Sequence, residues 1–164
     1  MSMAYINIGS NQGDRKAHIG QAVALIADIA ESEIVQSDYI ETPPWGYRSS
    51  EPYLNLGIAF ATSLQPEQLL DMLLAIERSI NPASHRDADG NYVDREIDID
   101  LIAVDNIIID SPRLTLPHPR MHLRDFVLAP MAQLAPDWRH PRLGLTPVQL
   151  LHNLKEDNNR SKDT

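Results

Sequence analysis

The sequence contains no cysteine. Disulfide bonds, thiolate zinc sites and thiol nucleophiles are therefore excluded, and the composition fits a reducing compartment. No apolar run reaches the roughly 18 residues that suggest a membrane-spanning helix. The first residues, MSMAYINIGSN, also lack a basic segment followed by a long hydrophobic one. The sequence therefore predicts a cytoplasmic protein without a signal peptide or a membrane span.

Positive charge is scarce as well. The chain has 14 Lys and Arg against 23 Asp and Glu, a formal net charge of −9. Proteins that bind nucleic acids or anionic membranes present a basic surface, so we expect neither partner. With 164 residues, 43% of them hydrophobic, the chain is long enough for one domain with a sizeable core. We expect that domain over residues 1–154 and a polar, disordered tail over residues 155–164.

The spacing of apolar residues predicts strands and helices in alternation. Two-residue periodicity favours strands over residues 4–11, 33–42, 53–64 and 93–106. Helical periodicity favours helices over residues 14–31, 66–81, 126–136 and 146–154. We expect residues 107–110 to form a short partner of the strand before them, and residues 111–125 to form a long loop.

The predicted order of elements indicates the fold class. Strand, helix, strand, strand, helix, strand is the order of the ferredoxin-like, split βαβ arrangement. This is an α+β fold, an α/β sandwich with a mainly antiparallel sheet, and we expect the helices to pack on one face of it. Because the same fold supports many activities, function has to be argued from a site.

Two aspartates interrupt the last apolar strand, in the segment DREIDIDL. Alternation places Asp98 and Asp100 on the same face as Ile102 and Val104, with Cα atoms roughly 7 Å apart. Two neighbouring carboxylates suit a hard divalent cation, and Mg²⁺ takes few carboxylates before completing its shell with water and phosphate oxygens. A solvated face, on which the acids simply keep a sheet edge soluble, is the plainer alternative.

Cationic side chains lie on both sides of this acidic pair. They are Arg86, Arg95, His118, Arg120, His122 and Arg124. Cations around a carboxylate pair are the pattern expected where a metal-bound polyphosphate is held. Surface arginines and loop histidines are usually incidental, however, and for Arg120 and His122 we favour that interpretation.

Six short motifs then occur in order along the chain: GSN after the first strand, TPPWG, YLN, DREIDIDL, LPHPRMHLRDFVLAP, and HP followed by a glycine. In this order and spacing the sequence resembles the 6-hydroxymethyl-7,8-dihydropterin pyrophosphokinases. These folate-pathway enzymes transfer pyrophosphate from ATP to a pterin. The resemblance extends from about residue 4 to about residue 152.

The resemblance implies a role for each matching residue. Asp98 and Asp100 correspond to the metal ligands that hold two Mg²⁺ ions on ATP, and they are catalytic together with Arg86, Arg95 and His118. The implied ATP-binding residues are Glu77, Arg86, Arg95, His118 and Arg124. The implied pterin-binding residues are Thr42, Pro43, Trp45, Tyr53, Asn55 and Phe126.

The pterin-binding set has a specific chemistry. Tyr53 and Phe126 would stack on the two faces of the flat pterin ring, and the Asn55 amide can both donate and accept hydrogen bonds. Without the resemblance, core packing would be the simpler explanation for the two aromatic residues. The expected ligands are ATP and a reduced pterin, on a monomeric enzyme. No strong general base is required, because this type of transfer depends on positioning and charge neutralisation.

The segment NPASHRDADGNYVDR departs from the family pattern. Arg86 stands where relatives carry two arginines, Tyr92 stands in place of a tryptophan, and after His118 a proline replaces a frequent tyrosine. Part of the segment also matches a calcium-binding loop through Asp87, Asp89, Gly90 and Glu96. That loop would begin with His85 instead of aspartate, and a strand follows where a helix is needed. A non-catalytic interaction domain is a third alternative.

Overall fold

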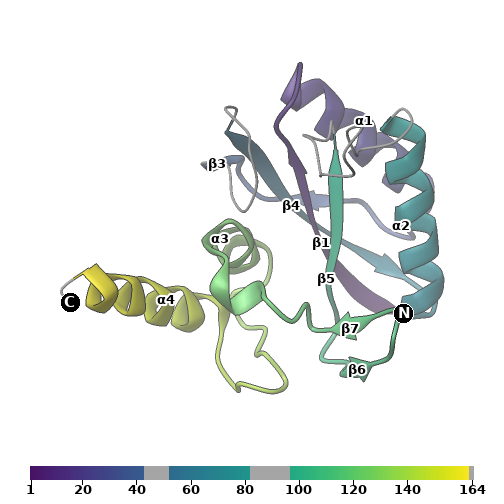
Figure 1. The fold of residues 1–164 in the computed structure, drawn as a ribbon. Coiled ribbons are helices and arrows are strands. Elements are labelled where there is room, and N and C mark those ends of the chain that lie inside the picture. The colour runs from purple at the N-terminus through teal and green to yellow at the C-terminus, as the bar shows by residue number, and fades with distance from the viewer. Residues whose placement is uncertain (43–51, 82–96, 163–164) are drawn as a thin grey trace.

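The computed structural model describes residues 1–42, 52–81 and 97–162 (Figure 1). Its strands are β1 (Ser2–Ser10), β2 (Val35–Gln36), β3 (Ile40–Thr42), β4 (Tyr53–Thr62), β5 (Asp98–Val104), β6 (Ile109–Asp110) and β7 (Thr115–Leu116). Its helices are α1 (Arg15–Ala27), α2 (Pro66–Ile80), the 3₁₀ helix η1 (Met121–Leu123), α3 (Asp125–Leu134) and α4 (Pro147–Lys162). The predictions for Pro43, Trp45, Arg86 and Arg95 lie outside these residues, as does the possible calcium loop.

The main sheet has the strand order β2-β4-β1-β5, and β3 also pairs with β4. Every pairing within it is antiparallel. The ferredoxin-like α+β prediction is confirmed. The single strand predicted over residues 33–42 is divided into β2 and β3 at Ser37, whose hydroxyl accepts a hydrogen bond from Gly57 N at 2.9 Å. The hydroxyl therefore takes a position that a backbone carbonyl would occupy in an unbroken ladder.

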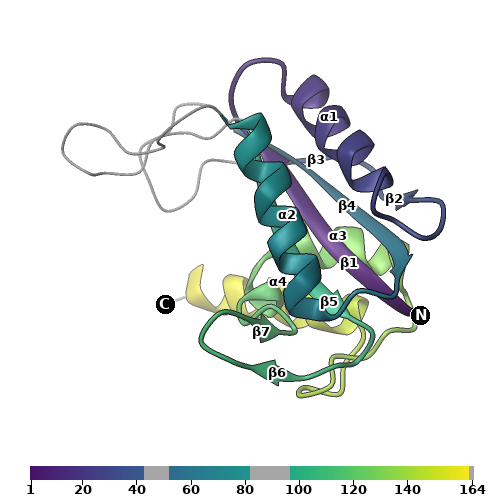
Figure 2. The same ribbon diagram turned by 90° about the vertical axis from the view of Figure 1, so that its right-hand side faces the viewer.

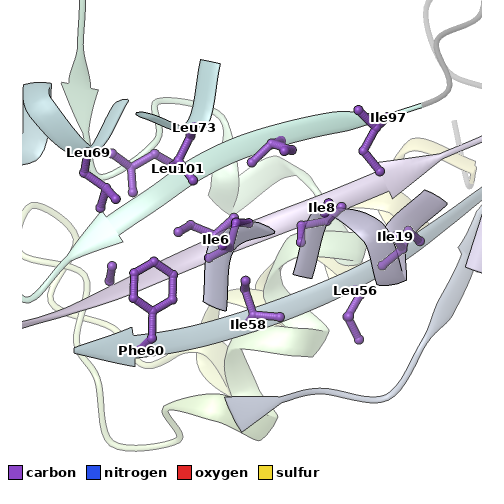
Figure 3. Close-up of a cluster of buried hydrophobic side chains, with 14 of the residues drawn as sticks. Ile6, Ile8, Ile19, Leu56, Ile58, Phe60, Leu69, Leu73, Ile97 and Leu101 are labelled. Atoms are coloured by element: carbon purple, nitrogen blue, oxygen red, sulfur yellow. The ribbon is translucent and has the colours of Figure 1, made fainter. Parts of the chain in front are cut away.

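Helices cover both faces of this sheet, so the prediction of a single covered face is wrong. Figure 2 shows α1 and α2 in front of the sheet and α3 behind it. Between the sheet and the helices α1 and α2 lies a hydrophobic cluster that includes Ile6, Ile8, Ile19, Leu56, Ile58, Phe60, Leu69, Leu73, Ile97 and Leu101 (Figure 3). A second cluster joins Ile102 and Ala103 to α3 and α4. The second face is covered because α3 is itself strongly apolar and needs a surface on which to bury Val127, Leu128 and Met131.

A bulge in β5 changes the side-chain alternation after the aspartates. Tyr5 pairs with Ala103 and Ile6 with Leu101, which leaves Ile102 as the extra residue. Strict alternation placed Ala103 with Leu101 and Val104 with Ile102, and this prediction is wrong. Val104 lies in the cluster with Leu101, and Ala103 lies in the other cluster. Asp98 and Asp100 precede the bulge, so they still share a face.

Helix α2 follows its predicted bounds closely. Pro66 occupies its first turn, and the Gln65 and Gln68 side chains cap its N-terminus reciprocally. Its buried residues, Leu69, Leu73 and Ile80, form an amphipathic stripe against the sheet. The last turn of α2 therefore lies beside β5.

Two predictions near the C-terminus differ from the structure. Strand β6 pairs with β7, not with β5. Helix α4 continues to Lys162, through residues that the sequence predicted to be a disordered tail. Ion pairs at helical spacing, Arg160 with Glu156 and with Asp157, support the added turns. Within the part of the chain that the structure describes, no helix is both long and apolar enough to cross a membrane.

The contact between α3 and β4 is tight at Gly57, and it gives a test of the second packed face. A Cβ atom at Gly57 would lie 2.5 Å from Pro130 Cβ and 3.1 Å from Leu134 Cδ1. We expect Gly57→Ala to lower the free energy of unfolding by about 1–3 kcal/mol, because backbone would have to move. Urea unfolding measures this change.

Gly20→Ala is the matched control, since a Cβ at Gly20 in α1 meets no atom within 4 Å. This control should be neutral or should stabilise the protein by up to about 1 kcal/mol, because alanine favours a helix over glycine. If both variants had equal stability, the close packing of α3 on β4 would be refuted.

Candidate active site

Strand pairing brings the predicted site residues together from distant parts of the chain. Gly9 on β1 is paired with Asn55 on β4 and with Asp98 on β5. The next row of the same face places Asn7 between Gly57 and Asp100. Residues paired directly across an antiparallel sheet point to the same face. The two carboxylates and the Asn55 amide therefore share one face, the face that α3 covers.

Gly9 lies at the centre of this face, where neighbouring side chains leave little room for a Cβ atom. A Cβ atom there would lie 3.0 Å from Asn55 Oδ1 and 3.4 Å from Tyr53 Cδ1. Tyr53 and Asn55 therefore crowd around a position that has no side chain, beside Asp98. The prediction from sequence missed Gly9, although the glycine of the GSN motif was a usable signal.

Asn55 is oriented by its neighbours on β3. It is 3% exposed, and its Nδ2 donates to Thr42 Oγ1 at 3.0 Å and to the Ile40 carbonyl at 3.4 Å. The Oδ1 atom, an acceptor, faces Gly9. The predicted partners Thr42 and Asn55 thus form one hydrogen-bonded unit, which fixes the direction in which the amide can accept.

Phe126 and Arg124 lie at the start of α3, the helix that covers this face of the sheet. Phe126 is half-buried and packs against the second apolar cluster. The Arg124 guanidinium carbon lies 5.7 Å from the centre of the Phe126 ring, a cation–π arrangement. An aromatic face and a positive charge are therefore held side by side, which suits a ligand with a planar part next to an anionic part.

The outer edge of β5 is fastened to α2 by two side chains. Asn81 donates to the Ile97 carbonyl and accepts from Ile97 N, both at 2.9 Å. Glu77 Oε2 accepts from Ile99 N, also at 2.9 Å. The bonded residues, Ile97 and Ile99, alternate with Asp98 and Asp100 along the strand, so these hydrogen bonds hold the backbone on either side of Asp98 in place. Glu77, predicted to bind ATP, is thus also a support for the acidic strand.

A cleft of about 420 Å³ runs along this edge. Four predicted residues, Glu77, Asp98, Asp100 and His118, line it. It is also lined by residues that the sequence did not indicate, among them Leu70, Ser111, Arg113 and Thr115. Arg113 forms an ion pair with Asp71 on α2. The segment between β6 and β7 carries no recognisable motif, so the sequence does not indicate that its residues line the cleft. The structure shows that they do, because the chain turns back after β6.

His118 is held as a neutral side chain. Its backbone N donates to the Ile102 carbonyl at 2.8 Å, and its Nδ1 accepts from Arg120 N at 3.1 Å. Burial and, to a smaller extent, the nearby charges of Arg124 and Arg120 together lower the pKa of the His118 imidazole from 6.5 to about 4. With Nδ1 accepting, the proton is on Nε2, which can donate to an anionic ligand.

The acidic pair fits one kind of metal. Among the described residues there is no group of three or more His, Asp or Glu side chains arranged to hold an ion. Asp98 and Asp100 are both partly exposed at the cleft. Two carboxylates are too few for a closed calcium or zinc site, whereas Mg²⁺ binds through one or two carboxylates and takes its other ligands from water and phosphate. The donor set therefore fits Mg²⁺ bound together with a phosphate ligand.

Comparison with known sequences agrees with this chemistry. Residues 5–136 match the sequence model of the 7,8-dihydro-6-hydroxymethylpterin-pyrophosphokinase family. A 2-amino-4-hydroxy-6-hydroxymethyldihydropteridine pyrophosphokinase of Porphyromonas gingivalis is 37% identical over 143 residues, covering 86% of this chain and 95% of the relative. The enzyme of the same name from Bacillus subtilis is 37% identical over 134 residues, 81% of this chain and 78% of the relative.

Solved structures agree on the fold. An HPPK-DHPS crystallised with substrates superposes with a TM-score of 0.72 at 13% identity over 99% of this chain. The Plasmodium falciparum HPPK-DHPS with pteroate gives a TM-score of 0.72 at 15% identity over 96% of this chain. This chain spans 45% and 44% of those two chains.

The lowered pKa of His118 predicts a pH dependence of stability. The unfolded chain takes up a proton on this residue near pH 6.5, whereas the folded protein does so only near pH 4. As the pH falls through this window, the unfolded state binds more protons, so stability falls. From pH 7 to pH 5 the expected loss from His118 is about 2 kcal/mol.

Urea unfolding of the ligand-free protein at both pH values measures this loss. We expect His118→Gln to remove it, while His152→Gln, at an exposed position on α4, should leave the wild-type difference in place. An unchanged pH dependence in His118→Gln would show that this imidazole does not stay neutral in the folded protein.

Proposed function

The chain belongs to the 7,8-dihydro-6-hydroxymethylpterin-pyrophosphokinase family, and we propose that the face formed by β4, β1, β5 and the start of α3 is its active site. The protein transfers pyrophosphate from ATP to the hydroxymethyl group of 6-hydroxymethyl-7,8-dihydropterin. The products are AMP and the pterin diphosphate, in folate biosynthesis. What remains to be assigned is the role of each residue.

The pterin lies beside Asn55 in this proposal, stacked between Tyr53 and Phe126. The fixed orientation of the Asn55 amide and the position of Tyr53 next to it support this placement. A pterin carries N–H donors on the edge of a flat ring, so a fixed acceptor beside an aromatic surface suits it. Thr42 supports Asn55, and we assign Pro43 and Trp45 to the same half of the site on the sequence resemblance alone.

The triphosphate lies along the cleft, at the end of β5. Asp98 and Asp100 would hold two Mg²⁺ ions there, Arg124 and the Nε2 proton of His118 would contact phosphate oxygens, and Glu77 keeps the strand in position. Support comes from the four predicted residues that line one cleft and from the donor that the His118 tautomer leaves available. Arg86 and Arg95 complete the ATP half on the resemblance alone.

The pterin hydroxymethyl oxygen attacks the β-phosphorus of ATP in line. The bond from that phosphorus to the oxygen bridging the α- and β-phosphates breaks, and the bridging oxygen leaves with AMP. The hydroxyl proton passes to one of the two aspartates or to water. When bound, Mg²⁺ would neutralise charge on the phosphates. Arg124 and His118 add fixed positive charge and a donor on the same phosphates.

One observation carries the proposal, namely the register that aligns Asn55, Gly9 and Asp98 in a row. A non-catalytic interaction domain would have no need for an oriented amide and a carboxylate pair on one face. We also propose that the enzyme is cytoplasmic, where ATP and reduced pterins are available, and that it acts as a monomer. Cell fractionation and analytical ultracentrifugation test these two points.

The acidic pair gives the main test of the ATP half. We expect Asp98→Asn and Asp100→Asn each to lower kcat/KM by about a thousandfold or more, because the metal-bound phosphates lose their anchor. AMP formation from ATP and 6-hydroxymethyl-7,8-dihydropterin is the measurement. EDTA should abolish turnover in the wild type, and added Mg²⁺ should restore it.

Asp110→Asn is the matched control, because Asp110 pairs with Arg142 on the surface. Its activity should stay within about twofold of the wild type. Wild-type turnover in both Asp98→Asn and Asp100→Asn would refute the assignment of the metal ligands.

Asn55 tests the pterin half. We expect Asn55→Ala to raise the KM for the pterin about 10- to 100-fold with little change in the KM for ATP, because a site built on hydrogen bonds loses affinity when one partner is removed. Steady-state kinetics with each substrate varied in turn measures both constants. Asn153→Ala, on the exposed side of α4, is the control. A rise confined to the KM for ATP would show that Asn55 does not contact the pterin.

A further inference from the structure

Helix α3 contains a proline in a position that disturbs its first turn. Pro130 lies four residues after Phe126 within Asp125–Leu134. In a regular helix the N–H at position 130 would donate to the carbonyl at position 126, but proline has no N–H. The Phe126 carbonyl thus loses its helical donor at a place where the helix packs against the sheet. A buried carbonyl without a donor is costly.

A side chain from β1 supplies the missing donor. Asn7 Nδ2 donates to the Phe126 carbonyl at 2.9 Å, across 119 residues of sequence. Asn7 lies on the central strand and is 5% exposed. Its neighbour in the row on β4 is Gly57, which has no side chain, and Pro130 packs above that glycine. The absent side chain at Gly57 allows α3 to come close enough for the Asn7 amide to reach the Phe126 carbonyl.

We propose that Asn7 is a positioning residue for pterin binding: by donating to the Phe126 carbonyl, it fixes the first turn of α3 and with it the Phe126 ring over the site. This inference rests on the proposed function, because it requires that Phe126 stack on the pterin. Asn7 itself does not contact the substrate in the proposal. It acts through the backbone of the stacking residue.

The hydrogen bond to Phe126 explains why a polar residue is buried in the middle of β1. The neighbouring β1 positions Ile6 and Ile8 are buried aliphatic residues that pack toward α1 and α2. On the opposite face, an amide in the middle of a sheet is tolerated only when it is hydrogen-bonded. The bond to Phe126 provides such a partner. Sheet and helix are therefore joined by one directional contact at the residue on which the aromatic stack depends.

The cross-strand partner of Asn7 on β5 is Asp100. Asn7 thus stands between the proposed metal strand and the proposed stacking residue. A shift of about 1 Å in the ring would separate the hydroxymethyl group from the phosphate held at Asp100, and misplacement on this scale is sufficient to reduce a transfer rate strongly. Asn7 therefore fixes the position of Phe126 relative to Asp100, because it is hydrogen-bonded to the first residue and paired with the second in the sheet.

The first experiment removes the donor. We expect Asn7→Ala to weaken pterin binding about tenfold, since an unfixed first turn of α3 has to be ordered by the ligand. Calorimetry with 6-hydroxymethylpterin, in the presence of Mg²⁺ and a non-hydrolysable ATP analogue, measures the pterin Kd. The Kd of the ATP analogue, measured separately, should change less than about twofold. A purely structural role for Asn7 would lower stability without this difference between the two ligands.

The second experiment restores a donor from within the helix. Pro130→Ala returns an N–H that can donate to the Phe126 carbonyl and keeps the Cβ atom that packs at Gly57. In the Pro130→Ala background, Asn7→Ala should therefore change the pterin Kd less than about twofold. The comparison is a double-mutant cycle on one carbonyl. If Asn7→Ala alone does not fold, Asn7→Ser, with a shorter side chain and little change in polarity, replaces it in the cycle.

Phe126→Ala separates failure of this inference from failure of the proposed function. If Phe126→Ala leaves the pterin Kd unchanged, the stacking role in the proposed function is wrong. If Phe126→Ala weakens the pterin but Asn7→Ala does not, only the positioning role is overturned. It is also overturned if the effect of Asn7→Ala is equally large with and without Pro130, because the Phe126 carbonyl would then not be the atom through which Asn7 acts.

Discussion

The antiparallel pairing of β1 with both β4 and β5 is the constraint on which the rest of the site depends. It aligns residues near positions 9, 55 and 98 in a single row, although the chain separates them widely. Side-chain direction alternates along each strand, so a slip of one residue in either pairing would turn the carboxylates or the Asn55 amide to the other face. The long apolar contacts with α1 and α2 select one register, because only that register buries Ile6, Ile8, Leu56 and Ile58 together.

One face of the sheet carries the main hydrophobic core, and the other carries the residues of the proposed site. The face under α1 and α2 is apolar along its length, and it carries the larger of the two hydrophobic clusters. The opposite face is apolar only where α3 and α4 pack, and at the other end it carries Asn55, Gly9, Asp98 and Asp100. Polar side chains are tolerated on this face for two reasons. The Asn55 amide is hydrogen-bonded to β3, and the two carboxylates are partly exposed at the cleft.

Local patterns predicted the elements and the acidic pair, whereas long-range pairing determined what they missed. Alternation alone placed Asp98 and Asp100 on one face, since no bulge intervenes between them. It failed after Leu101, because the bulge at Ile102 depends on the partner strand. Apart from the glycine of the GSN motif, the sequence does not single out Gly9 or Asn7. The contacts of Gly9 with Asn55 and Tyr53, and of Asn7 with Phe126, join residues that lie far apart in the sequence. The second covered face was missed for the same reason.

The acidic strand is fixed before any ligand binds. As an edge strand, β5 has backbone groups on its outer side that need partners, and α2 supplies them through Asn81 and Glu77. His118 N adds a third contact at the Ile102 carbonyl, beyond the aspartates. Catalysis by positioning requires groups that do not have to be ordered during the reaction. The same hydrogen bonds that protect a sheet edge therefore also hold Asp98 and Asp100, the proposed metal ligands, in place, and fold stability and site geometry share one set of contacts.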